Sequence, residues 1–229
     1  MSPINLWSDL LANPAITTAL WPAFVETLAM VGLAGLATVV LGLPLGVVLF
    51  VTQPGGLAQH RLLNVVLSGI VVNITRSIPY AILMVTLIPF TRVLVGTSIG
   101  PIAAAVSLTI AAVPFFARLV ETALREVHPG KLDAAHAMGS TRFQTVRKVL
   151  LPEALPGLVA GLTTTVVALI GYSAKAGLIG GGGLGRLAYN NGYQRFQPEV
   201  MLVVLVILVL LVQLAQWAGD ALIRRLDHR

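Results

Sequence analysis

The chain has 229 residues, of which 56% are hydrophobic and only 10% are charged, and its mean hydropathy is +0.88. Soluble domains carry roughly 25% charged residues, so this composition excludes an ordinary soluble domain and indicates a membrane protein. The absence of cysteine excludes a disulfide framework and a thiolate metal site. The net charge of +6 is explained by membrane topology, and we expect no nucleic-acid partner.

Apolar runs long enough to cross a bilayer recur along the whole chain. They lie at about 23–51, 62–90, 98–118, 155–178 and 199–222. They lack the alternation of strands, and backbone groups in lipid must be satisfied within the segment, so we predict five transmembrane helices. Pro44, Pro79 and Pro114 fall inside the first three runs. We expect them to kink these helices, which suits a transport path more than a plain anchor.

Lys and Arg are distributed unevenly between the segments that join these helices. With the N-terminus outside, ten lie in inner segments and three in outer segments, while Arg76 and Lys175 fall inside spans. Because cytoplasmic loops hold the excess of Lys and Arg, we predict an external N-terminus and a cytoplasmic C-terminus. The expected organisation is an external segment at 1–18, a transmembrane domain at 19–223 and a cytoplasmic tail at 224–229.

One polar, basic stretch interrupts the apolar sequence, at residues 132–152 (LDAAHAMGSTRFQTVRKVLLP). It lies in a predicted cytoplasmic loop at about 119–154. The third span is predicted to continue past the membrane until HPG at 128–130 stops it. LDAAHAM then predicts a short helix of one or two turns, which Gly139 terminates.

The second half of the stretch predicts another helix. Thr141 and Gln144 have the spacing of a capping box, and the helix that they begin is expected to run to Pro152. The small side chains of Ala134 and Ala135 on the preceding short helix leave a low ridge that can lie in another protein's groove. From the spacing alone, an amphipathic helix lying on anionic lipid is equally open.

The spacing of this stretch resembles the EAA loop of ABC importer permeases, EAA-x3-G-x9-I-x-LP. The residues that match the pattern are Asp133, Ala134, Ala135, Gly139, Val149, Leu151 and Pro152. Asp stands in place of Glu, and Val in place of Ile. In that family the loop forms the coupling helix, which docks in a cleft of the cytoplasmic ATPase. The resemblance implies the type I ABC importer permease fold and assigns ATPase coupling to these residues, Val149 excepted.

Two further stretches are similar to the methionine-import permeases: RSIPYAILMV at 76–85 and GYSAKAGLIGGGGLGRLAYNNGYQRF at 171–196. The resemblance covers roughly residues 20–225. It implies a homodimer in the bacterial inner membrane, two cytoplasmic ATPase subunits that bind ATP and Mg, and an external substrate-binding lipoprotein. It also implies that the permease translocates methionine, as the D or L form, by alternating access.

We predict that the pore or gate includes residues of the second and fourth spans, namely Arg76, Pro79, Tyr172, Ser173 and Lys175, and the resemblance implies this for the position of Lys175. Lys175 departs from the family, which usually carries Met there. It either snorkels from the outer end of its span or lines the gate, where two copies would repel each other. Arg76 either belongs to the pathway or satisfies the carbonyl of Thr75, which Pro79 leaves without an N–H donor.

Residues 180–185 contain a formal G-x-G-x-x-G. A dinucleotide loop also needs a preceding strand, a following helix and a downstream acid, and none of these is convincing here. We favour an external segment that permits close backbone approach. The chain has no G-x-x-x-x-G-K-[ST], so we expect a transport subunit rather than an enzyme, with no cofactor of its own. The four histidines form no HExxH-like pair, so no metal site is expected.

Two pairs of glycines, Gly42 with Gly46 and Gly157 with Gly161, have the GxxxG spacing that permits close helix packing. Glu26, near the outer end of the first span, is interpreted as an interfacial residue. Two other functions remain open at this level: a sibling importer permease for another small solute, and a secondary transporter that needs no ATP. Inverted repeats would favour the latter, and five spans do not divide into equal halves.

Overall fold

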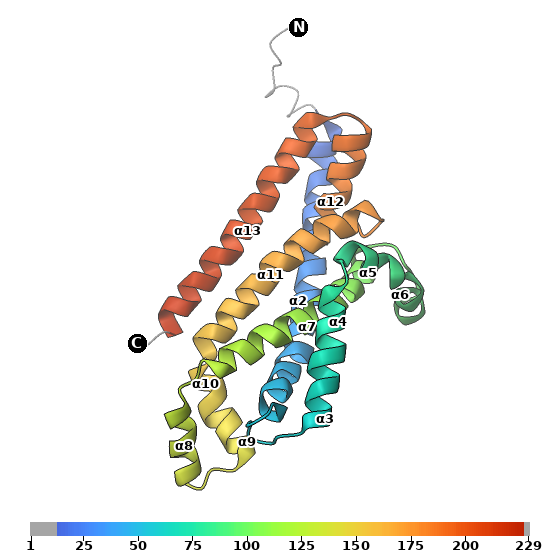
Figure 1. Cartoon of the computed structure of the whole chain (residues 1–229). Helices are drawn as coiled ribbons and strands as arrows, with labels where there is room; N and C mark the ends of the chain where they lie inside the picture. The colour runs from blue at the N-terminus through green and yellow to red at the C-terminus, as the bar shows by residue number, and fades with distance from the viewer. Residues whose placement is uncertain (1–12, 227–229) are drawn as a thin grey trace. The chain divides into compact units, whose positions relative to one another are not determined.

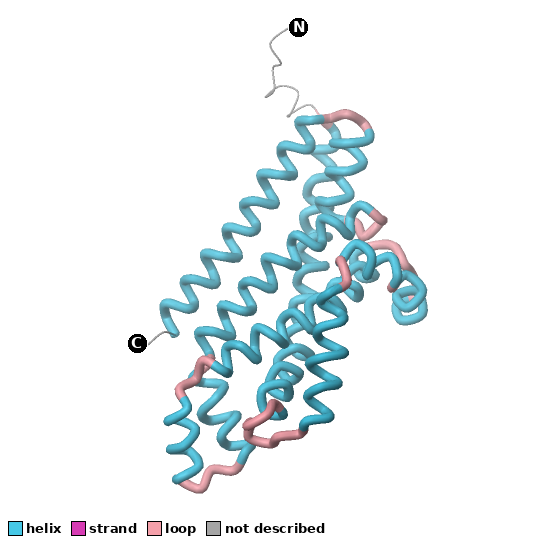
Figure 2. The backbone as a smooth tube through the Cα atoms, in the orientation of Figure 1, coloured by secondary structure: helices cyan, strands magenta, loops and turns pink. Residues whose placement is uncertain are grey.

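The computed structural model describes residues 13–226, which form helices joined by turns, with no strand within that range (Figure 2). Figure 1 labels the α-helices. In the order of the elements given next, η denotes a π-helical segment. Their order is η1 Ala15–Ala19, α2 Leu20–Thr52, α3 Arg61–Asn64, η2 Val65–Val72, α4 Asn73–Ser77, α5 Tyr80–Thr86, α6 Ile88–Val95, α7 Pro101–Arg125, α8 Pro129–Ala137, α9 Arg142–Thr145, η3 Val146–Leu150, α10 Leu151–Glu153, α11 Leu155–Leu178, α12 Gly183–Leu187, η4 Ala188–Gln194 and α13 Pro198–Leu226.

Within residues 13–226, four helical segments are long and apolar enough to cross a membrane: Ala15–Thr52, Pro101–Arg125, Leu155–Leu178 and Pro198–Leu226. A fifth is present if the bent pair Arg61–Ser77 and Tyr80–Thr86 counts as one span. The predicted all-α membrane fold is confirmed, with the second span broken in two. Many leucines and valines of α13 are exposed, as expected of a helix whose outer face meets lipid.

The second span breaks where the sequence predicted only a kink. Helix α4 ends at Ser77, Ile78 has an extended backbone (φ −81°, ψ 123°), and α5 begins after Pro79. The ring of a proline disfavours the α conformation in the residue before it, and proline has no N–H to continue the helical ladder. By contrast, Pro44 and Pro114 lie inside the continuous helices α2 and α7.

The first and last long helices extend beyond the predicted bounds of the transmembrane domain, 19–223. The first helix already begins at Ala15, so residues 15–18 of the predicted external segment are helical. Arg224 and Arg225, assigned to the C-terminal tail, continue α13. Residues 1–12 and 227–229 of these two predicted segments lie outside the described residues.

The chain divides into two compact units whose boundaries fall within α2, α7, α11 and α13 and between α4 and α5. The first comprises Met1–Gly35, Pro79–Ile110 and Val166–Ala215, and the second comprises Leu36–Ile78, Ala111–Thr165 and Gln216–Arg229. The buried apolar core of the first unit includes Ala15, Ala23, Leu184, Leu187, Val200 and Val204.

Close helix packing in the second unit follows the GxxxG spacing. A Cβ added to Gly46 would lie 2.5 Å from the Cβ of Val120, and one added to Gly42 would lie 3.0 Å from Phe116. A Cβ on Gly157 would lie 3.0 Å from that of Ala123. The glycines therefore let α2 and α11 approach α7 closely, as the sequence predicted.

Candidate coupling surface and gate

The polar stretch begins with a short helix that has its own N-terminal cap. Helix α7 ends at Arg125, and α8 begins at Pro129. Between them, the Nδ1 atom of His128 accepts a hydrogen bond from the N–H of Gly130 at 3.1 Å. Pro129 and Gly130 thus do more than end the preceding helix, because they form the first turn of the next one. Proline suits this position, where the backbone N–H has no helical partner.

The turn between the two helices of the loop contains the predicted glycine terminator and the predicted capping box. Gly139 has φ +74°, and the N–H of Ser140 donates to the carbonyl oxygen of Ala135 at 3.1 Å. The Thr141 hydroxyl accepts from the N–H of Gln144 at 3.3 Å, and the Gln144 side chain accepts from the N–H of Thr141 at 2.9 Å. A left-handed glycine and a complete capping box therefore define the loop.

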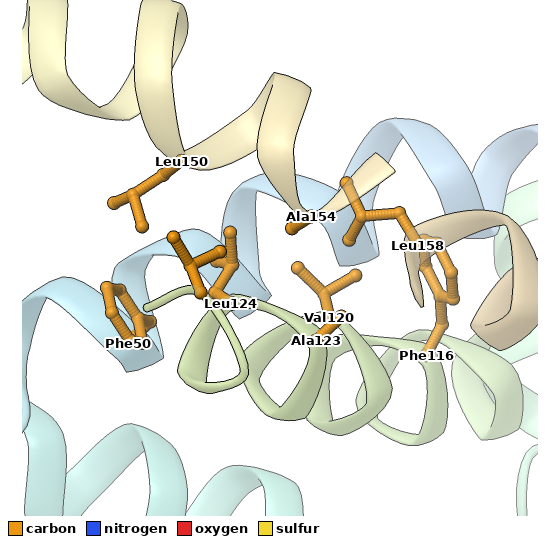
Figure 3. Packing of buried hydrophobic residues seen from close by; sticks show 9 residues of the cluster. Phe50, Phe116, Val120, Ala123, Leu124, Leu150, Ala154 and Leu158 are labelled. Carbon is orange, nitrogen blue, oxygen red and sulfur yellow. The ribbon is translucent and has the colours of Figure 1, made fainter. Parts of the chain in front are cut away.

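The returning helix is fastened to α7 by a buried apolar core (Figure 3). Leu150 is fully buried and belongs to the same cluster as Leu124 and Val120 of α7. Burying one such leucine contributes about 1.5–3 kcal/mol. An ion pair between Lys131 and Glu153 also joins α8 to α10. These contacts fix the loop to the end of α7.

The predicted coupling residues differ in how far their side chains are exposed to solvent. Asp133, Ala134, Gly139 and Pro152 are exposed, Leu151 is half-buried, and Ala135 is 1% exposed. Ala135 packs against its own chain, so its burial does not support a direct contact with another protein. Sequence reasoning missed Met138 and Phe143, which lie on either side of the Gly139 turn with exposed fractions of 79% and 69%. The sequence could have indicated these two residues, because large apolar side chains are unusual within a polar stretch.

Arg76 lies in the last turn of α4 with its side chain exposed. Its Cζ atom is 5.9 Å from the ring centroid of Phe115, within the range of a cation–π contact. The carbonyl oxygen of Thr75 accepts from the N–H of Ile78 at 3.3 Å. That carbonyl therefore has a backbone donor, and the local role considered for Arg76 is unnecessary. Its role in the pathway stays a prediction.

In the first unit, two predicted gate residues, Tyr172 and Lys175, form a cluster with Tyr80. Tyr80, the residue after Pro79, stacks on Tyr172 with ring centroids 4.6 Å apart. The exposed Lys175 places its Nζ atom 5.5 Å from the Tyr172 centroid. Ser173 is 1% exposed and donates its hydroxyl to a carbonyl of its own helix at 2.8 Å. The stacked rings and the ammonium group form one cluster, whereas Ser173 is turned into the fold.

The glycine-rich segment is held by two side chains of α2. The N–H of Gly183 donates to the Glu26 carboxylate at 2.6 Å, and the N–H of Leu184 donates to the Thr27 hydroxyl at 2.9 Å. Arg186 lies 3.7 Å from the same carboxylate. The segment follows a helix rather than a strand, which does not support a dinucleotide loop. Sequence reasoning placed Glu26 at the interface and missed this anchoring contact.

Comparison with known sequences identifies the family of the chain. Residues 39–228 match the family described as "Binding-protein-dependent transport system inner membrane component". The chain belongs to this family. This inner membrane component accordingly crosses the membrane several times through its apolar helices. The permease family predicted from the spacing of the loop is therefore confirmed.

The permease has close relatives of known or inferred transport function. It is 51% identical over 219 residues to the "Probable D-methionine transport system permease protein MetI" of Vibrio cholerae, covering 96% of this chain and 95% of that protein. It is 57% identical over 152 residues to the "D-methionine transport system permease protein MetI" of Escherichia coli K12, covering 66% and 70%. An inward-facing structure of the MetNI methionine ABC transporter superposes with a TM-score of 0.88 at 53% identity, covering 91% and 96%. The expected importer fold is confirmed.

Proposed function

We propose that this permease is the membrane subunit of an ATP-driven importer that translocates methionine, in its D or L form, by alternating access. The observation that carries the proposal is the 51% identity, along nearly the whole chain, to a protein named as a probable D-methionine transport permease. An ATP-independent secondary transporter is not favoured, because a loop built to dock on an ATPase has no use there. A sibling importer for another solute would share the loop but not this level of identity.

We infer that two copies of the chain form the transport path and that two ATPase subunits bind their loops. ATP and Mg are bound by those ATPase subunits, and an external lipoprotein delivers the substrate. The placement of Lys and Arg supports an external N-terminus and a cytoplasmic C-terminus. The loop at 119–154 is then cytoplasmic, on the side where ATP is available.

The docking surface consists of the exposed residues of the loop. Asp133, Ala134 and Gly139 present small or acidic groups, and Met138 and Phe143 present large apolar side chains. Burial of exposed aromatic and methionine side chains is a common source of affinity at protein interfaces. Behind this surface, the buried core and the Lys131–Glu153 ion pair transmit the displacement of α8 to α7.

The gate of the permease is proposed to include Tyr172 and Lys175. In a homodimer the two Lys175 ammonium groups would repel each other at short range, more strongly where the dielectric constant is low. The ammonium group makes a cation–π contact with the ring of Tyr172, which is itself stacked on Tyr80. Arg76 and Pro79 are proposed to act where the second span is broken. The burial of Ser173 leaves it a packing role at the same helix.

The decisive experiment is transport by purified components. The permease is reconstituted in liposomes with its ATPase inside and its binding protein outside, and uptake of a panel of labelled amino acids is measured. We expect ATP-dependent uptake of D- or L-methionine in preference to leucine and histidine. Uptake without the ATPase, or preference for another solute, would overturn the proposal.

A further inference from the structure

Helix α7 carries a buried carboxylate for which no motif gave a role. The side chain of Glu121 is 2% exposed. Its Oε2 atom accepts from Arg118 at 2.6 Å, and its Oε1 atom accepts from Arg125 at 2.5 Å. A buried carboxylate is tolerated only when it is paired in this way. The sequence shows the three residues at helical spacing on one face of α7.

Both arginines extend beyond their own helix. Arg118 donates to the hydroxyl of Ser68 in η2 at 3.0 Å and to the side-chain oxygen of Asn73 in α4 at 2.7 Å. Arg125 donates to the side-chain oxygen of Gln53, which directly follows α2, at 2.9 Å. One carboxylate therefore orients two guanidinium groups that contact other segments of the second unit. Such forked, charge-assisted bonds are strong and directional.

The segment that Arg118 contacts has few buried residues. Over Arg61–Ser77, which comprises α3, η2 and α4, Val72 is the one buried residue. It forms a small cluster with Leu49 and Ala117. The Asn64 side chain bonds to Leu49 and Thr52 of α2, at the start of the segment. The two bonds from Arg118 are the side-chain hydrogen bonds that join the segment to α7, beside the cation–π contact of Arg76. The segment ends next to Pro79, where the second span breaks.

The hydrogen-bonded network of Arg118, Glu121 and Arg125 lies between the docking helix α8 and the broken second span along the chain, which indicates a role in coupling. Arg125 is the last residue of α7, and the docking helix α8 begins at Pro129. We propose that Glu121 is a positioning residue for transport, which holds Arg118 so that displacement of the docking loop passes through α7 to α3–η2–α4. The inference rests on the proposed function, since an ATPase must supply the displacement. The ion pair with Glu121 fixes the Arg118 guanidinium, and its two hydrogen bonds to Ser68 and Asn73 make the segment follow α7 instead of sliding along it.

The test breaks the outward contacts and leaves the ion pairs intact. Glu121→Gln alone would leave two arginines without their counter-charge and endanger folding. The informative variant is the double substitution Ser68→Ala with Asn73→Leu, which removes the two acceptors of Arg118 in η2 and α4 and keeps Glu121. Its matched control is Thr75→Val with Ser77→Ala. The hydroxyls of Thr75 and Ser77 bond only to carbonyls of their own helical segment, at 2.7 and 2.8 Å.

The first readout is the amount of solute transported per ATP hydrolysed by the complete transporter in liposomes. We expect the Ser68/Asn73 variant to lose about fivefold in this ratio, a change typical of contacts that couple two sites, with little change in ATPase activity. The control variant should keep the ratio of the unmodified protein. Equal ratios in the two variants, whether both normal or both reduced, would overturn the role of the network.

The second readout needs no transported solute. Spin labels on the exposed residues Ala137 and Ile74, both in the second unit, report the distance between α8 and α4. We expect ATPase closure by trapped nucleotide to leave this distance nearly constant in the unmodified protein and to lengthen or broaden it in the Ser68/Asn73 variant. The same response in both proteins would overturn the inference. If the expected difference is found but no methionine is transported, the substrate assignment fails and the network stands.

Discussion

Replacing Gly139 by valine tests whether the backbone of the docking loop controls coupling. Gly139 has φ +74°, and a residue with a side chain pays about 1–2 kcal/mol to adopt this left-handed conformation. A Cβ at this position would meet nothing within 4 Å, so no clash within the chain adds to that cost. Since 1.4 kcal/mol corresponds to a factor of ten, the native turn should become about 5–30-fold less populated relative to alternatives.

The matched control is Gly139→Asn, because asparagine tolerates the left-handed conformation and is similar in size to valine. We expect the valine variant to hydrolyse ATP while transporting much less solute per ATP, and the asparagine variant to retain most coupling. Transport and ATP hydrolysis are measured in liposomes, with thermal unfolding as the check on folding. Equal losses in both variants would refute the conformational reasoning and indicate crowding at the interface. Normal transport in both would refute the docking assignment.

Three further results are expected. Gly46→Ala should destabilise the permease by about 1–3 kcal/mol in thermal unfolding, because the new Cβ would lie 2.5 Å from a side chain of α7. Lys175→Met should lower the basal ion leak of liposomes without abolishing transport, because it removes the repulsion between two ammonium groups at the gate. A label at Ser2 should react with reagents outside the cell, and one at Arg229 only after permeabilisation, because Lys and Arg predominate in the predicted inner segments.

Each of these results has a control or a contrary outcome. Gly32→Ala is the control for Gly46, because a Cβ at Gly32 would meet nothing within 4 Å and should not destabilise the helix. Equal unfolding temperatures of the two variants would contradict the packing argument. Unchanged leak and transport in the Lys175 variant would count against a gate role. The reverse labelling pattern at the termini would exclude the proposed topology.

Features that depend on neighbouring residues could be predicted from the sequence. The capping box of Thr141 and Gln144 and the left-handed Gly139 form as expected, because each is completed within one or two helical turns. The close approach at Gly46 follows in the same way from a spacing within one helix. The family could be inferred because the loop keeps an unbroken spacing over twenty residues.

Contacts between segments that are distant in the chain could not be predicted from local sequence patterns. Helical spacing places Arg118, Glu121 and Arg125 on one face of α7, but their partners are far away in the chain: Ser68 lies 50 residues from Arg118, and Gln53 lies 72 residues from Arg125. Ala135 fits the coupling pattern, yet folding turns it against its own chain. A helical period shows which residues share a face. Only the packed structure decides what that face contacts, because burial and hydrogen bonding are settled by residues distant in sequence.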